Sequence, residues 1–310
     1  MKKVISKYLY LTAFAVAIVC FLILLITDSI IVLLSPGLIL KIVILLVASV
    51  LMSAILTIGV SIMNPVLSDT MATLRRMLRV ESLSNPLLLR MSSEAPGTYH
   101  HSMNVSSLAQ KAAKSIGADA LLVRSAAYYH DIGKLDNPHA YVENQSGIEV
   151  PTSENAESIR RDAKEIISHV EKGIKIAQEN KLPDEIIDLI RQHHGTTCAL
   201  YFYVIAKERG LKIKKTDLRY SGPTPQSKEA AILMLADCVE ATAKAQQVLT
   251  PEKIESIVGS TIEERLADKQ FKSSGLSDLD LAKIKTAMKE TLRSIYHQRI
   301  EYGTKESPKN

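Results

Sequence analysis

The chain has 310 residues, enough for one large domain or two small ones, and 46% of them are apolar. Its formal net charge of +5 is modest and does not require a nucleic-acid partner. The three cysteines, Cys20, Cys198 and Cys238, are far apart, which argues against a disulfide framework and fits a reducing compartment. The apolar excess lies before Asn64, so we expect a membrane segment followed by a soluble, helix-rich domain.

Two uncharged apolar runs, at about residues 8–27 and 42–63, predict a hairpin of transmembrane helices within residues 1–68. Each run is about long enough to cross a hydrocarbon layer of roughly 30 Å. The first run could instead be a cleaved signal peptide, but no small-residue cleavage site precedes the second. Lysines before the first run and arginines after the second mark both flanks as cytoplasmic. We therefore expect a multi-pass protein of the cell membrane, in contact with the lipid bilayer, with its soluble domain in the cytoplasm.

A basic, amphipathic stretch at residues 69–93 connects the hairpin to the soluble domain, and Asn85-Pro86 interrupts it. This pattern is typical of a plain linker, and equally of a juxtamembrane helix that lies on the membrane or pairs with a second copy of itself. The second alternative would make the protein a homodimer.

The soluble domain, residues 94–303, shows the apolar periodicity of helices and is followed by a short tail, residues 304–310. Prolines and polar residues indicate loops at 136–155 and 217–227. No alternating strand pattern of any length is present, so the expected fold is all-α. We expect helices at about 98–117, 119–131, 156–180, 184–194, 196–209, 229–248, 251–269 and 278–302.

Seven histidines and aspartates lie at the ends of these helices or on their apolar faces. Buried imidazoles and carboxylates are costly unless they are paired or bound to metal. Taken singly, each is more often an ordinary core or surface residue, but the set includes most of the eight histidines. Seven nitrogen and oxygen ligands exceed the needs of one open site and match two metal ions that share a carboxylate. The seven are His101, His130, Asp131, His169, His193, His194 and Asp237.

Several stretches carry a resemblance to a known family: Glu94–Ser102 (EAPGTYHHS), Tyr128–Lys134 (YYHDIGK), Ile167–Val170 (ISHV), Arg191–Thr197 (RQHHGTT), Met234–Asp237 (MLAD) and Ile295–Tyr302 (IYHQRIEY). Through them the sequence resembles the HD-domain phosphohydrolases. It is most similar to the cytoplasmic domain of the seven-transmembrane HD (PgpH-type) phosphodiesterases that degrade cyclic di-AMP. The resemblance covers nearly all of residues 90–302 and implies an HD-domain helical bundle.

The resemblance also implies a site with two divalent metal ions, iron or manganese. One would be held by His101, the histidine before Ser102, together with His130, Asp131 and Asp237. The other would be held by His169, His193 and His194, with Asp131 bridging both. The metals would activate a water for in-line attack on phosphorus, which opens cyclic di-AMP to linear pApA.

The same resemblance suggests further roles in catalysis and substrate binding. Asp131 and Lys134 would be catalytic, with Lys134 holding a phosphate oxygen as a point charge. Six residues near the paired histidines and in a following loop would contact the substrate, a cyclic dinucleotide. They are Arg191, Thr196, Thr197, Tyr220, Gly222 and Pro223.

The sequence departs from the family in two places. The family usually has more membrane spans and a sensor domain before the catalytic domain, whereas two spans are predicted here. The loop at residues 136–161 also differs, with Asn137 in place of a basic residue, which leaves the substrate preference open. The alternatives are an HD hydrolase of cyclic di-GMP, an alarmone or a nucleotide monophosphate; a di-iron oxygenase; and a non-catalytic cyclic-dinucleotide receptor. Gly195-Thr196-Thr197 replaces the Gly-Tyr-Pro expected of a cyclic di-GMP enzyme.

Overall fold

The computed structural model describes residue 18, residues 37–145 and residues 155–296, and within these ranges it contains helices and no strand. The chain divides into two compact units, residues 1–78 and residues 79–310. The expected all-α fold is confirmed for the described residues. Apart from Ile18, the first predicted membrane run lies outside them.

The first unit contains most of helix α2 (Leu38–Glu81), whose apolar part matches the second predicted membrane run. A candidate span covers Leu40–Ser61, with a mean hydropathy of 2.7 and no part buried within the protein. This part of α2 is apolar on all sides and unburied, and it is long enough to cross a bilayer.

Helix α3 (Pro86–Glu94) follows after a short turn, at the interruption that the sequence predicts. The side-chain oxygen of Asn85 accepts a hydrogen bond from the Leu87 amide at 2.9 Å, which caps the helix. Pro86 occupies the first helical position, where a missing N–H costs nothing. Val80, Leu88 and Met91 are buried in the second unit, so part of the connecting stretch belongs to its core.

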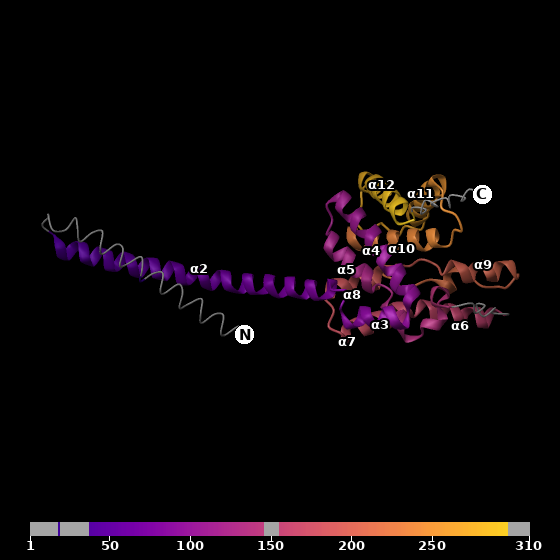
Figure 1. The fold of residues 1–310 in the computed structure, drawn as a ribbon, viewed down its shortest axis with the longest axis horizontal. Coiled ribbons are helices and arrows are strands. Elements are labelled where there is room, and N and C mark those ends of the chain that lie inside the picture. The colour runs from indigo at the N-terminus through magenta and orange to yellow at the C-terminus, as the bar shows by residue number, and fades with distance from the viewer. Residues whose placement is uncertain (1–17, 19–36, 146–154, 297–310) are drawn as a thin grey trace, which may run out of the picture. The chain divides into compact units, whose positions relative to one another are not determined.

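The second unit is a bundle of helices joined by short 3₁₀ turns (Figure 1). Figure 1 shows α11 and α12 at one end of this unit and α6 and α7 at the other. The helices are α4 (Pro96–Ile116), α5 (Ala120–Tyr129), α6 (Ala156–Ile167), α7 (His169–Glu179), α8 (Asp184–Gln192), α9 (Leu200–Glu208), α10 (Lys228–Lys244), α11 (Pro251–Ala267) and α12 (Asp278–Ile295). The 3₁₀ turns are η1 (Ile132–Asp136), η2 (Pro138–Ala140), η3 (Val142–Asn144) and η4 (Lys215–Leu218).

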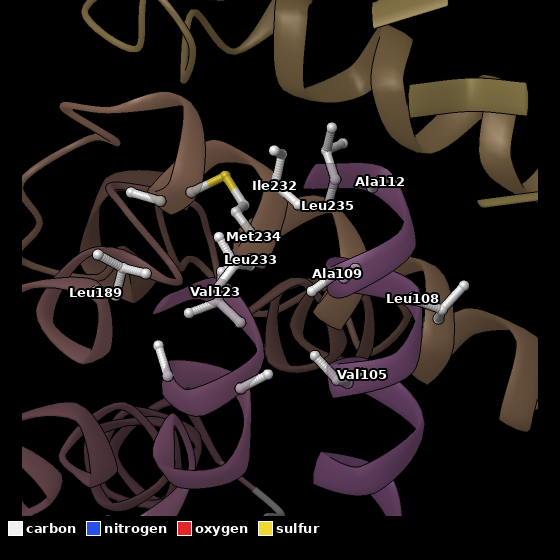
Figure 2. Close-up of a cluster of buried hydrophobic side chains, with 14 of the residues drawn as sticks. Val105, Leu108, Ala109, Ala112, Val123, Leu189, Ile232, Leu233, Met234 and Leu235 are labelled. Atoms are coloured by element: carbon white, nitrogen blue, oxygen red, sulfur yellow. The ribbon is translucent and has the colours of Figure 1, made fainter. Parts of the chain in front are cut away.

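Helix α10 lies at the centre of the core and contacts α4, α5, α8, α11 and α12. Every residue from Ala230 to Asp237 is buried, as expected for a helix that is apolar on all sides. Small side chains on α4, among them Ala109 and Ala112, are fully buried and belong to the same cluster (Figure 2). This packing holds Asp237 of α10 close to the helices that carry the histidines.

Two helices differ from the expected ranges. The helix predicted at 156–180 is two helices, α6 and α7, which are separated at Ser168. The helix predicted at 196–209 begins only at Leu200. The residues before it pair with the loop instead, since the Tyr220 amide donates to the Thr197 carbonyl at 2.9 Å. Both differences affect the site described next.

Candidate metal centre

Three histidines lie at helix ends and are oriented by the same kind of contact. Nδ1 of His130 lies 2.8 Å from the Ala127 carbonyl, Nδ1 of His169 lies 2.7 Å from that of Ile166, and Nδ1 of His193 lies 2.6 Å from that of Ile190. A carbonyl only accepts, so each Nδ1 carries the proton. Each Nε2 of a neutral ring therefore keeps a lone pair that can bind a metal.

Close backbone packing brings Asp131 next to His169. A Cβ at Gly133 would overlap the His169 carbonyl, so only glycine allows η1 to lie this close to α7. As a result, Oδ1 of Asp131 lies 3.3 Å from Nε2 of His169.

The seven predicted residues form two adjoining groups of candidate metal ligands. One contains Asp131, His169, His193 and His194, the other His101, His130 and Asp237, and within each group the ligand atoms lie within 4.8 Å of one another. All are buried except His194, which is partly exposed, while the neighbouring His100 is exposed.

Asp131 faces both groups. Its Oδ1 points toward His169 and lies 3.8 Å from Nε2 of His193, whereas its Oδ2 lies 3.3 Å from Nε2 of His130 and 3.8 Å from Nε2 of His101. One carboxylate oxygen for each group is the arrangement that a bridging ligand requires.

The residues of both groups fit metal ions. Nε2 of His130 and Oδ1 of Asp131 are buried without a hydrogen-bond partner among the described residues. Nε2 of His169 and Nε2 of His193 face each other at 3.2 Å, although in the neutral rings neither carries a proton. Two opposed lone pairs and two orphaned polar atoms are costly in a buried site unless a cation binds them. A nitrogen and oxygen donor set of this kind suits divalent transition metals.

The charges in the site are strongly perturbed. Burial alone would lower the pKa of His130, but the neighbouring Asp131 outweighs it, aided by Asp237, and raises that pKa to about 10. Burial, reinforced by His130 and His169, lowers the pKa of His193 to about 3. Burial would raise the pKa of Asp131, yet Lys134 and His130 hold it well below its usual range. At neutral pH Asp131 is therefore ionised and His193 is neutral, which are the forms that bind metal, whereas His130 would release a proton when a metal binds.

Glu240, which sequence reasoning missed, orients His101. It is fully buried on α10, one turn after Asp237, and it accepts a hydrogen bond from Nδ1 of His101. Its other oxygen accepts from Asn104 at 2.9 Å and from the Tyr296 hydroxyl at 3.2 Å. Nε2 of His101 is thereby directed to Oδ1 of Asp237, 3.0 Å away. The spacing of two acidic residues by three positions on one apolar helix was the available signal.

Lys134 lies beside Asp131, as its place in the motif suggests. Its Nζ is 2.8 Å from Oδ2 of Asp131 and 2.7 Å from Oε1 of Glu143, a residue of η3 that sequence reasoning also missed. The two carboxylates neutralise the ammonium group and fix its position.

Two cavities adjoin the histidines, and the predicted substrate residues that line a cavity are divided between the two. The larger, of about 800 Å³, is lined by Asp131, Lys134, Asp237, Thr197 and Tyr220, among others. The smaller, of about 200 Å³, is lined in part by Arg191, Tyr220 and Gly222. The Tyr220 ring stacks on His194, with centroids 4.2 Å apart. Thr196, bonded to Gln270, and Pro223 line neither cavity.

Comparison with known proteins places this arrangement in a family. The HD domain family profile matches residues 98–242. The chain is 41% identical to the cyclic-di-AMP phosphodiesterase PgpH of Bacillus subtilis over 227 residues, which are 73% of this chain and 32% of that protein. It is 43% identical to PgpH of Listeria monocytogenes over 231 residues, 74% of this chain and 32% of that protein. The chain thus spans about a third of the length of these relatives.

Solved structures agree with the sequence comparison. The crystal structure of the L. monocytogenes PgpH HD domain has 42% sequence identity and a TM-score of 0.64, and the match covers 69% of this chain and 100% of that one. A second structure of that domain, in complex with cyclic di-AMP, has 43% identity and a TM-score of 0.63, with 70% and 100% covered. The motifs, the fold and these matches together show that the chain belongs to the HD-domain family, in the group that includes the PgpH proteins.

Proposed function

We propose that the chain is a membrane-anchored, metal-dependent phosphodiesterase that hydrolyses cyclic di-AMP to linear pApA. The observation that carries this proposal is the pair of adjoining groups of candidate ligands, both faced by Asp131, on the wall of a cavity of about 800 Å³. Two relatives at 41% and 43% identity are named cyclic-di-AMP phosphodiesterases, and a similar HD domain has been crystallised with cyclic di-AMP.

The proposed cofactors are two iron or manganese ions. His101, His130, Asp131 and Asp237 would hold one, and His169, His193 and His194 the other, with Asp131 as the shared ligand. When bound, two such ions activate a water for attack on phosphorus and neutralise charge on the phosphoryl oxygens.

The chain's own residues position the substrate. Lys134 binds a phosphoryl oxygen: burial lowers its pKa, but Asp131 and Glu143 outweigh this and raise it, so the side chain stays charged. Tyr220, held by its stack on His194, offers a ring face to an adenine base. Thr197 contacts the substrate in the larger cavity, and Arg191 and Gly222 contact it in the smaller one.

Membrane anchoring rests on the candidate span Leu40–Ser61. Within the proposed hairpin, both ends of the chain lie on the cytoplasmic side of the cell membrane, where the substrate is a soluble nucleotide. Pairing of two copies through the juxtamembrane stretch would make the enzyme a homodimer.

The substrate is tested by loading the full-length chain, in detergent, with Mn²⁺ or Fe²⁺ and separating the products of several nucleotides by chromatography. We expect cyclic di-AMP to be converted to pApA faster than cyclic di-GMP is consumed. If cyclic di-AMP stays intact while another nucleotide is consumed, the proposed substrate is wrong.

Asp131→Ala tests the shared ligand. The variant removes the oxygens that face the two groups, so we expect it to lose bound metal and turnover together, measured by elemental analysis and by pApA formation. Asp136→Ala is the matched control, because Asp136 is an exposed neighbour that pairs with Lys172 instead. Full activity in Asp131→Ala would contradict a mechanism with two metals.

A further inference from the structure

The larger cavity extends beyond the candidate metal ligands along α10. Asp237, Ala241 and Ala245 line it at intervals of four residues, so the cavity follows one face of the helix for two turns. At 1.5 Å per residue, eight residues correspond to about 12 Å. The cavity is therefore longer than a single phosphodiester bound at the ligand groups requires.

An unpaired guanidinium lines this extension. Arg265, on α11, has a buried Nε without a hydrogen-bond partner, and the side chain forms no ion pair within the part of the chain that the structure describes. Its one side-chain hydrogen-bond partner is the thiol of Cys238, a weak acceptor, while the carboxylates of Glu264 and Asp237 act on it through their charge without bonding to it. A partly desolvated guanidinium without a directly bonded carboxylate is costly, which indicates that a ligand supplies the bonded anion.

Other cations near the site already have anionic partners. Lys134 contacts Asp131 and Glu143, and Arg219 forms a two-point ion pair with Asp268, at 2.7 and 3.2 Å. Lys244, which lines the same extension as Arg265, forms no ion pair among the described residues. Cations without a directly bonded carboxylate are thus concentrated at this part of the cavity.

We propose that Arg265, assisted by Lys244, forms an anion subsite for the second phosphate of a cyclic dinucleotide while the first phosphate lies at the metal ligands. The inference rests on the proposed function. A guanidinium donates two parallel hydrogen bonds to phosphate oxygens, so it suits a phosphodiester better than a point charge does. The subsite would favour substrates with two phosphates over single phosphodiesters.

The test compares two substrates of the full-length, Mn²⁺-loaded chain in detergent: cyclic di-AMP and bis(p-nitrophenyl) phosphate, which has one phosphodiester. Charge-assisted hydrogen bonds contribute about 1.5–3 kcal/mol, or about 10–100-fold. We expect Arg265→Gln to lower the ratio of the two kcat/KM values by about this factor, mainly through the KM for cyclic di-AMP. Arg265→Lys should lower the ratio less, and Arg293→Gln, on the exposed surface of α12, should leave it unchanged.

An unchanged ratio in Arg265→Gln would overturn the subsite, whether neither kcat/KM value falls or both fall by the same factor. Failure of the wild-type chain to hydrolyse cyclic di-AMP would overturn the proposed function instead. In that case the subsite is judged by calorimetric binding of pApA, which needs no turnover. Weaker binding in Arg265→Gln than in Arg293→Gln would support the subsite, and equal binding would overturn it.

Discussion

One local rule orients three of the histidines. His130 and His193 directly follow α5 and α8, and His169 begins α7 two positions after the end of α6, so each lies just beyond a helix end, where backbone carbonyls lack helical partners. Each Nδ1 donates to the carbonyl three residues earlier, which satisfies that carbonyl and turns Nε2 into the site. The helix ends thus set the tautomer that metal binding requires.

His101 lacks such a carbonyl and depends on Glu240 instead, which gives a prediction. Glu240→Ala removes the acceptor that fixes His101, and we expect metal affinity or turnover to fall about 10–100-fold. Glu240→Gln keeps a hydrogen-bond acceptor for His101, so its metal affinity and turnover should fall less. Mn²⁺ titration followed by electron paramagnetic resonance measures the affinity, with the exposed Glu255→Ala as control. Equal affinity in Glu240→Ala and the control would show that Glu240 does not position His101.

At the residue scale, the motifs predicted the seven side chains that the structure brings together. They did not predict Glu240 or Glu143, because their roles depend on contacts between distant segments: α10 with α4 and α12, and η3 with η1. For the same reason Thr196 turned out to bond Gln270, which lies 74 positions later in the chain.

At the element scale, helix periodicity predicted the all-α fold but not where every helix ends. The apolar positions continue on both sides of Ser168, so the pattern shows no sign of the break between α6 and α7. The start of α9 is delayed because residues 197–199 pair with residues 218–220, a contact that depends on the tertiary fold.

The close approach of η1 and α7 leads to a second prediction at this scale. In Gly133→Ala the new methyl group would overlap the His169 carbonyl, so the two elements must separate. We expect a loss of about 3 kcal/mol or more in the free energy of unfolding, together with loss of bound metal. Thermal unfolding and elemental analysis of the full-length chain measure both.

The control is another glycine in a different environment. Gly259 lies within α11, where an added Cβ would meet only the flexible end of Lys285. Since alanine is a better helix former, Gly259→Ala should stabilise the protein by about 0.5–1 kcal/mol. If the two variants had the same stability, close packing at Gly133 would not be what positions Asp131.

At the scale of the whole molecule, the last residues of α2 are bonded to α5, the helix that directly precedes His130 and Asp131. Glu81 accepts from Arg124 at 2.6 Å, and the Tyr129 hydroxyl donates to the Val80 carbonyl at 2.7 Å. Tyr129 directly precedes His130, so the chain that enters the second unit contacts the base of the candidate site.

The topology of the membrane segment gives the last prediction. With two spans, at about residues 8–27 and 42–63, the connection near Pro36 lies outside the cytoplasm and Glu81 lies inside it. Alkaline phosphatase, which is active only outside the cytoplasm, should be active when fused after Pro36 and inactive when fused after Glu81. If Leu40–Ser61 were the only span and the N-terminus were cytoplasmic, the two activities would be reversed. That result would place the candidate metal centre outside the cytoplasm, away from a cytoplasmic nucleotide, and would contradict the proposed function as well as the hairpin.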